Sequence, residues 1–226
     1  MGTGMIYMVM MVFSLILLIL SSSTVGFDYY QFTQQYQPAV CNSNPTPCKD
    51  PTDKLFTVHG LWPSDSNGND PKYCKAPPYQ TIKILEPQLV IIWPNVLNRN
   101  DHEGFWRKQW EKHGSCASSP IQNQKHYFDT VIKMYTTQKQ NVSEILSRAN
   151  IKPGRKNRTL VDIENAIRNV INNMTPKFKC QKNTRTSLTE LVEVGLCRDS
   201  NLTQFINCPR PFPQGSRYFC PTNIQY

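Results

Sequence analysis

The chain has 226 residues, with 25 Lys and Arg against 16 Asp and Glu, a formal charge of +9, and eight cysteines. At 39% hydrophobic, 11% aromatic and 18% charged residues, it is too apolar for a disordered polyelectrolyte and long enough to bury one substantial core. Beyond residue 20 no apolar run reaches the roughly 18 residues that a membrane-spanning helix needs, which excludes a polytopic membrane protein.

The first 26 residues are typical of a secretory signal peptide. Ile6–Leu20 is almost entirely apolar, and the small residues up to Gly26 suit cleavage after that glycine. Because this segment contains no Lys or Arg, an uncleaved anchor is the alternative. We predict a signal peptide at 1–26 and one domain at 27–226, which carries every charged side chain and every cysteine.

Strand-like composition opens the predicted domain. Phe27–Tyr36 and Leu55–Leu61 are rich in aromatic and β-branched residues, which favours two strands. Ser64–Tyr79, rich in Asn, Asp, Gly and Pro, predicts an exposed loop.

Helical periodicity follows in the middle of the chain. Asp101 is a candidate N-cap for a helix at Glu103–Lys112, and the apolar spacing predicts a second helix at Gln124–Gln138. Thr159–Asp162 resembles a capping box that opens a third helix running to Ile171. From Lys177 onward short strands return, so we expect an α+β fold and not a doubly wound sheet.

The cysteines and sequons fit an oxidising compartment. An even number of cysteines behind a signal peptide predicts up to four disulfides, whereas cytosolic thiols or a zinc site are the alternatives and no CxxC pair is present. Four glycosylation sequons begin at Asn141, Asn157, Asn173 and Asn201.

Two of the four histidines stand in aromatic, motif-like settings. His59 ends a predicted strand and His113 ends a predicted helix, so two imidazoles could serve as base and acid near neutral pH. Gln109 lies one turn before His113, and Lys112 could stabilise charge developing on a phosphate. A packed or surface histidine is the alternative interpretation. Metalloprotease, P-loop and GxSxG motifs are absent from the sequence.

The segments Phe56-Thr-Val-His-Gly-Leu-Trp-Pro63 and Lys112-His-Gly-Ser-Cys116 resemble the two active-site segments of the ribonuclease T2 family. Within that family the chain looks most like the plant self-incompatibility S-RNases of the rose-family type, supported by Phe27–Tyr36 and Ile91-Ile-Trp-Pro-Asn95. The resemblance implies a single disulfide-stapled domain with a central antiparallel sheet flanked by helices.

The resemblance also implies a metal-free mechanism without a cofactor. His113 would deprotonate the ribose 2′-hydroxyl, His59 would protonate the leaving 5′-oxygen, and Lys112 would stabilise the charged intermediate on the way to a 2′,3′-cyclic phosphate. Gln109 would complete the catalytic set. Phosphate and base would be bound by Gln35, Trp62, Asn95, Val96, Leu97, Phe105 and Trp110.

Two positions depart from the family pattern. Many members have a Glu where this chain has Gln109, and a neutral amide can hydrogen-bond a phosphoryl oxygen but cannot transfer a proton or tune His113 by charge. Ser64 stands where some members carry an Asp that helps to read the base, so base preference stays open.

The family disulfide pattern, carried over in chain order, implies the pairs Cys41–Cys48, Cys74–Cys116, Cys180–Cys220 and Cys197–Cys208. The second pair would tie the loop after the first motif to the end of the catalytic helix.

The leading hypothesis is a secreted, glycosylated, monomeric endoribonuclease of the style that cleaves single-stranded RNA and serves as the pistil determinant of gametophytic self-incompatibility. By resemblance it would enter pollen tubes and meet S-locus F-box proteins, with no membrane partner. Ser64–Tyr79 would help to set allelic identity, or be an ordinary solvated turn region.

Two alternatives to this function are a general ribonuclease for phosphate scavenging or defence and a catalytically inactive binding protein. The basic run at 152–158 could attract RNA or be a solvated loop.

Overall fold

The computed structural model describes residues 26–45, 48, 53–154 and 157–226. The predicted signal peptide therefore lies outside the described residues except for Gly26. Within the described ranges, no helix is long and apolar enough to cross a membrane.

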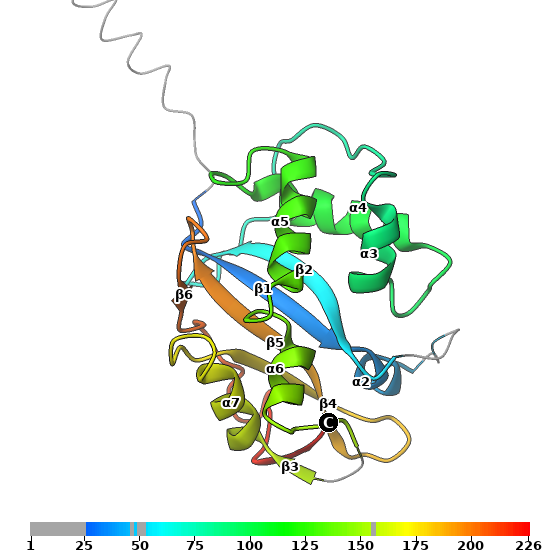
Figure 1. Cartoon of the computed structure of the whole chain (residues 1–226), viewed down its shortest axis with the longest axis vertical. Coiled ribbons are helices and arrows are strands. Elements are labelled where there is room, and N and C mark those ends of the chain that lie inside the picture. Colours follow the sequence, from blue (N-terminus) through cyan, green and yellow to red (C-terminus); the bar gives the residue numbers. More distant parts are fainter. Residues whose placement is uncertain (1–25, 46–47, 49–52, 155–156) are drawn as a thin grey trace, which may run out of the picture.

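A seven-stranded sheet organises the domain (Figure 1). Its strands are β1 (Tyr29–Tyr36), β2 (Phe56–Ser64), β3 (Asn157–Thr159), β4 (Lys177–Lys182), β5 (Thr189–Asp199), β6 (Phe205–Ile206) and β7 (Asn223–Gln225). The main order is β2-β1-β5-β7-β3, and β4 and β6 also pair with β5. All pairings are antiparallel except the short contact of β5 with β7. The eleven-residue β5 is therefore the strand on which the sheet is built.

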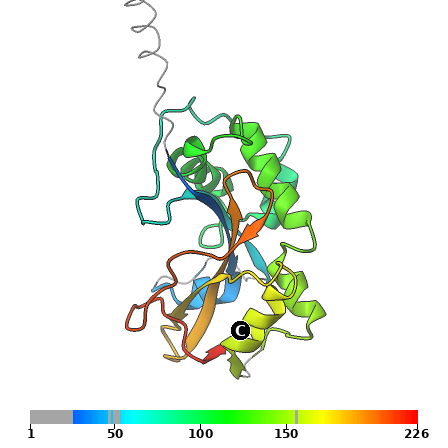
Figure 2. The ribbon, with the colours of Figure 1, turned by 90° about the vertical axis from the view of Figure 1, so that its left-hand side faces the viewer.

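Six helices pack around this sheet in the described part of the chain. They are α2 (Gln37–Asn42), α3 (Glu86–Ile92), α4 (His102–Lys112), α5 (Gln124–Thr136), α6 (Val142–Arg148) and α7 (Leu160–Arg168), with a short 3-10 turn at Gly114–Cys116. Helices α5, α6 and α7 lie against one face, and the C-terminal segment crosses the other (Figures 1 and 2). The two faces of the sheet consequently differ in what they contact.

Side chains alternate between the two faces of the sheet along β1, and this shows which face is apolar and which is polar. Tyr30 and Phe32 are fully buried in the core beneath α3, α4 and α5. Gln31, Thr33 and Gln35 point to the opposite face, as successive residues of a strand must, and line cavities there. The helix-covered face is thus the core, and the other face carries the polar cavities.

The edge strand β2 is held in place by side chains from the helices. Trp93 donates from Nε1 to the carbonyl of His59 at 3.0 Å. From α5, Tyr127 donates to the carbonyl of Leu61 at 2.8 Å, and Tyr135 to that of Phe56 at 2.7 Å. Buried hydrogen bonds of this kind contribute about 1 kcal/mol each and leave fewer free acceptors on an exposed edge. They fix the backbone of the strand that carries the first motif.

The predicted elements largely agree with the structure. Asp101 caps α4 by accepting a hydrogen bond from the Gly104 amide, and Thr159 caps α7 by accepting from Asp162. The α+β class with a central sheet is confirmed, as are the four disulfides, Cys41–Cys48, Cys74–Cys116, Cys180–Cys220 and Cys197–Cys208. Helices α2, α3 and α6 had not been predicted, because each is only six or seven residues long.

Candidate active site

His59 and His113 meet at one cavity of about 240 Å³ on the polar face of the sheet. His59 lies in β2 where the register with β1 skips a residue, and His113 is the C-cap of α4. The ring of Trp62 lies between them, 5.1 Å from the His59 ring and 5.3 Å from the His113 ring, measured between centroids. A strand bulge and a helix end therefore bring the two histidines of the motifs together.

A buried carboxylate holds His59. Oε1 of Glu193, on β5, lies 3.1 Å from Nδ1 of His59 and 2.9 Å from Nζ of Lys179. Burial opposes ionisation of Glu193, but His59 and Lys179 outweigh it and lower the pKa of this carboxyl to about 2. With Nδ1 bonded to the carboxylate, Nε2 is the ring nitrogen left for a substrate.

His113 has the opposite electrostatic setting. Burial lowers the pKa of His113 to about 3, and the positive charges of Lys112, His59 and Lys72 lower it further than the carboxylate of Asp70 raises it. The imidazole is therefore neutral across the physiological range. One ring is thus paired with a carboxylate and the other is kept neutral, which is the asymmetry that an acid and a base require.

Gln109 supports Trp62 and does not reach the cavity. Its Oε1 accepts a hydrogen bond from Trp62 Nε1 at 3.0 Å, and the side chain is buried. A Cβ on Gly60 would lie 2.2 Å from that indole nitrogen and 2.5 Å from that amide oxygen, so only glycine fits after His59. The sequence predicts that Gln109 and His113 face the same pocket, but of the two only His113 lines the cavity. Lys112, half-buried beside His113, also lies outside the residues that line the cavity.

Trp110 requires a correction, since the structure places it away from the histidine cavity. The side chain is buried in the core, where its ring packs 5.8 Å from that of Tyr127. A Cβ on Gly114 would lie 2.6 Å from the Trp110 ring, which explains the glycine after His113. Trp110 thus shapes the helix end from behind and borders a separate groove with residues 75–85. Because α4 carries several aromatic residues, the sequence did not show which of them face the cavity and which face the core.

A second cavity of about 580 Å³ adjoins the first. His59, Lys179 and Glu193 line both. The remaining positions predicted for substrate binding, apart from Trp62 in the first cavity, line the second: Gln35, Asn95, Val96, Leu97 and Phe105. The Phe105 ring is nearly parallel to that of His59, at 23°, with centroids 6.2 Å apart, and offers a surface on which a base can stack.

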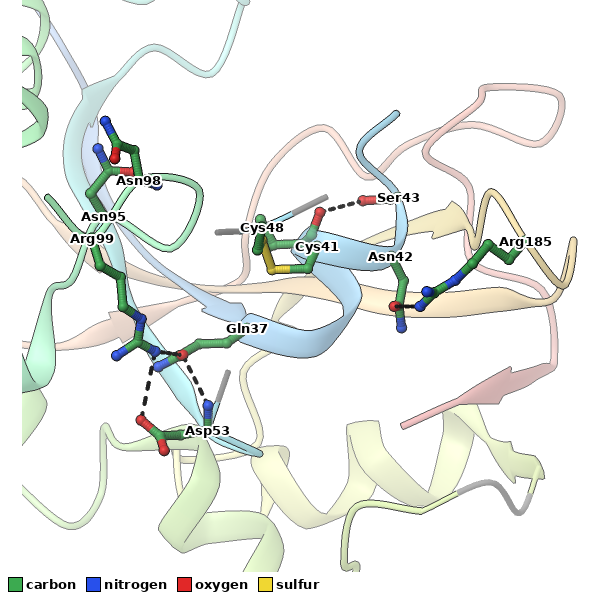
Figure 3. Close-up of a disulfide and its surroundings, with 11 residues drawn as sticks. Gln37, Cys41, Asn42, Ser43, Cys48, Asp53, Asn95, Asn98, Arg99 and Arg185 are labelled. Carbon is green, nitrogen blue, oxygen red and sulfur yellow. Dashed lines mark hydrogen bonds and ion pairs between the residues drawn. A yellow bond between two sulfur atoms is a disulfide. The ribbon is translucent and has the colours of Figure 1, made fainter. Parts of the chain in front are cut away.

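Hydrogen bonds hold the loop that carries Asn95. The Asn95 amide donates to Nδ1 of His102 at 2.9 Å, and its side chain donates to the carbonyl of Asp101. From the same loop Arg99 reaches Gln37 at 2.6 Å and pairs with Asp53, close to the Cys41–Cys48 disulfide (Figure 3). The wall of the second cavity is therefore fastened to α2.

The sequence did not reveal several residues of the site. Lys72, Lys177, Lys179 and Arg210 line the first cavity together with the carboxylates Asp70 and Glu193, and come from segments without a motif. One feature of the sequence could have pointed to Glu193. It is the only charged residue in the run Leu191–Leu196, which is otherwise apolar apart from Gly195. The excess of positive charge suits a polyanion.

The loop at Ser64–Tyr79 is docked onto the end of α4. The Tyr73 amide donates to the carbonyl of Lys112 at 3.0 Å, and the Cys74 amide donates to Ser115 Oγ at 3.1 Å. With the Cys74–Cys116 disulfide, these bonds fasten the loop to the chain on both sides of His113, between Lys112 and Cys116. The predicted loop is exposed at its centre, whereas Ser64 and Tyr79 at its ends are buried.

The fold and the site define an α+β enzyme with two histidines at a cationic cavity. The family model described as the Ribonuclease T2 family matches residues 27–208, and the chain belongs to this family of T2-type endoribonucleases.

Named relatives agree with this membership. The chain is 68% identical to Ribonuclease S-4 of Pyrus pyrifolia over 226 residues, 99% of each chain. The crystal structure of Japanese pear S3-RNase matches with a TM-score of 0.84 and 58% identity, over 88% of this chain and 100% of that one. RNase NT in complex with 5′-AMP matches with a TM-score of 0.76 and 28% identity, over 89% of this chain and 98% of that one.

Proposed function

We propose that this chain is a secreted, glycosylated endoribonuclease that cleaves single-stranded RNA by two-histidine transphosphorylation and acts as a pistil S-determinant. The observation that carries the enzymatic part is the pair of histidines on one cavity, one bound to a carboxylate and one kept neutral by burial.

The proposed reaction begins at His113. The neutral imidazole takes the proton of the ribose 2′-hydroxyl, and the resulting oxygen attacks the adjacent phosphorus. The bond from phosphorus to the 5′-oxygen breaks, and protonated His59 gives its proton to that oxygen, leaving a 2′,3′-cyclic phosphate. Because the attack needs a 2′-hydroxyl, DNA is inert.

Charge and aromatic rings complete the proposal. Lys112 lies next to His113 in the chain and stabilises the negative charge that develops on the non-bridging phosphate oxygens, through the field of a nearby cation. The leaving nucleoside stacks on Phe105 in the second cavity, and Trp62 borders the reacting phosphate. Asn95, Val96, Leu97 and Gln35 form the remaining walls.

The test of the chemistry uses purified protein and RNA in the presence of EDTA. We expect cleavage to a 2′,3′-cyclic phosphate, and a loss of about 10² to 10⁴ in rate for His59→Ala and for His113→Ala, as for the loss of a proton-transfer group. His126→Ala, at a histidine outside both cavities, is the matched control and retains full activity. Cleavage that persists in both active-site variants would contradict the mechanism.

The biological role rests on similarity to named relatives. Seven ribonucleases of Pyrus pyrifolia, S-1 to S-7, are 60–68% identical to this chain. We infer expression in the style, entry into pollen tubes and binding to S-locus F-box proteins, with Ser64–Tyr79 as part of the recognised surface and the enzyme as a monomer. Expression in roots under phosphate starvation, without rejection of pollen by styles that carry the protein, would favour a scavenging ribonuclease instead.

A further inference from the structure

Lys177 lines the histidine cavity without an anionic partner. It lies on β4 two residues before Lys179, so both side chains face the same side of the sheet. Lys179 pairs with Glu193, and the other cation near Lys177, Arg210, pairs with Asp70 at 2.8 Å. Lys177 forms no ion pair within the described part of the chain, and its Nζ lies 4.9 Å from the centre of the Phe212 ring.

Burial makes this arrangement unfavourable for the isolated protein. Desolvation lowers the pKa of Lys177, and Arg210 lowers it further, while Asp70 and Glu193 act in the other direction. Both of those carboxylates already have cationic partners. A half-buried ammonium that faces a cavity and lacks a carboxylate is satisfied best by an anion that enters the cavity.

The position of Lys177 defines where such an anion would belong on RNA. His59, Lys179 and Glu193 border both cavities, whereas Lys177, Arg210 and His113 border only the first. In the proposed reaction His59 protonates the leaving nucleoside, which therefore departs toward the second cavity. Lys177 lies on the other side, with the nucleotide whose 2′-hydroxyl is activated.

We propose that Lys177, with Arg210 beside it, binds the phosphate on the 5′ side of the cleaved nucleotide and so forms a subsite for RNA chains longer than a dinucleotide. The inference rests on the proposed RNA-cleaving function. The Phe212 ring beneath the ammonium keeps it extended toward the cavity through a cation–π contact. The subsite makes oligonucleotides better substrates than the bare dinucleotide.

The experiment compares three forms of one uridine dinucleotide: unphosphorylated, 5′-phosphorylated and 3′-phosphorylated. In the wild-type protein we expect the 5′-phosphate to raise kcat/KM by about tenfold, the effect of one charge-assisted hydrogen bond. In Lys177→Met the ratio between the 5′-phosphorylated and unphosphorylated forms falls to about one, and any ratio for the 3′-phosphate is unchanged. Lys177→Arg retains the gain. Lys182→Met, an exposed lysine on the same strand, is the matched control and keeps the full ratio.

Each outcome separates the subsite from the catalytic proposal. A ratio that stays near tenfold in Lys177→Met, or no gain from a 5′-phosphate in the wild type, overturns the subsite. A proportional loss on all three substrates also overturns it, since Lys177 would then act on the reacting phosphate. Because the ratio is measured on active enzyme, misfolded protein does not affect it, and Lys177→Gln repeats the measurement if the Met variant does not fold. Failure of the wild type to cleave both these dinucleotides and single-stranded RNA of mixed sequence would instead reject the proposed function.

Discussion

Glu193 holds His59 through a direct contact, with Oε1 of the carboxylate 3.1 Å from Nδ1 of the imidazole. The carboxylate comes from β5 and the imidazole from β2, two strands that are separated by β1. This contact fixes the orientation of the His59 ring, whereas His113 forms no ion pair with any residue that the structure describes. The difference in surroundings between the two histidines thus depends on a residue far from either motif in the chain.

Glu193→Gln keeps a hydrogen-bond acceptor at this position but removes the charge. We expect kcat/KM on RNA at pH 7 to fall by about 10- to 100-fold, less than the 10² to 10⁴ contributed by a proton-transfer group itself. The loss is expected because a neutral amide holds Nδ1 of His59 and Nζ of Lys179 less firmly than the carboxylate does. Steady-state kinetics on RNA at pH 7 measure the fall in kcat/KM.

A matched control for that variant lies on the same strand. Glu190→Gln changes a carboxylate that accepts hydrogen bonds from Asn42 and Asn183 and borders neither cavity. Its kcat/KM on RNA at pH 7 should match the wild type. If both variants lose activity equally, Glu193 acts through the stability of β5 and not through His59.

The low pKa of His113 predicts activity in acid. The pH dependence of kcat/KM reports the free enzyme, in which His113 stays unprotonated down to a pH of about 3. We therefore expect kcat/KM on a uridine dinucleotide, whose bases do not protonate in this range, to be sustained as the pH falls from 6.5 to about 4. Lys112→Met should move the acid limb to higher pH, because a positive charge beside His113 is removed. An acid limb near pH 6.5 in the wild type would contradict this.

Local patterns predicted the elements that carry the motifs, and long-range contacts supplied the rest. His59 and His113 could be paired from their sequence context, and the caps Asp101 and Thr159 could be located from spacing alone. Glu193, 134 positions from His59, could not be assigned, because only the pairing of β1 with β5 brings it to the site. Trp110 was misplaced for a related reason, since the rotation of α4 is set by packing against Tyr127.

Gln109→Glu places a carboxylate one turn before His113. The new side chain can still accept the hydrogen bond from Trp62, so the indole keeps its position. The negative charge should raise the pKa of His113 from about 3, because it favours the protonated imidazole. We expect the acid limb of kcat/KM to move to higher pH. Gln109→Met removes the acceptor without adding charge, and its acid limb should stay where it is in the wild type.

Loss of the Cys74–Cys116 disulfide should impair catalysis more than loss of Cys180–Cys220. The two bridges close loops of similar length, with sequence separations of 42 and 40. Double Cys→Ala variants should therefore lose similar stability, about 2 to 5 kcal/mol each, in denaturant unfolding. Only the first bridge, together with Tyr73 and Cys74, fastens the chain beyond His113. At a temperature where both variants are folded, the first should have the lower kcat, and equal values would argue against this role.

Of the sequons, Asn141 stands in a different setting from Asn201. Asn141 is 8% exposed and caps α6 by accepting a hydrogen bond from the Glu144 amide, whereas Asn201 is exposed. A glycan on Asn141 would have to displace the side chains that bury it, so we expect protein from a eukaryotic host to carry a glycan at Asn201 and none at Asn141. Asn141→Ala should leave the mass of the glycoprotein unchanged except for the residue itself, while lowering the free energy of unfolding by about 1 kcal/mol through loss of the cap.

Asn201→Ala should do the reverse, removing the mass of one glycan with little change in the free energy of unfolding of the deglycosylated protein. Intact-mass spectrometry measures the first quantity and urea titration the second. A glycan-sized loss of mass in Asn141→Ala would show that α6 forms its cap around a modified side chain.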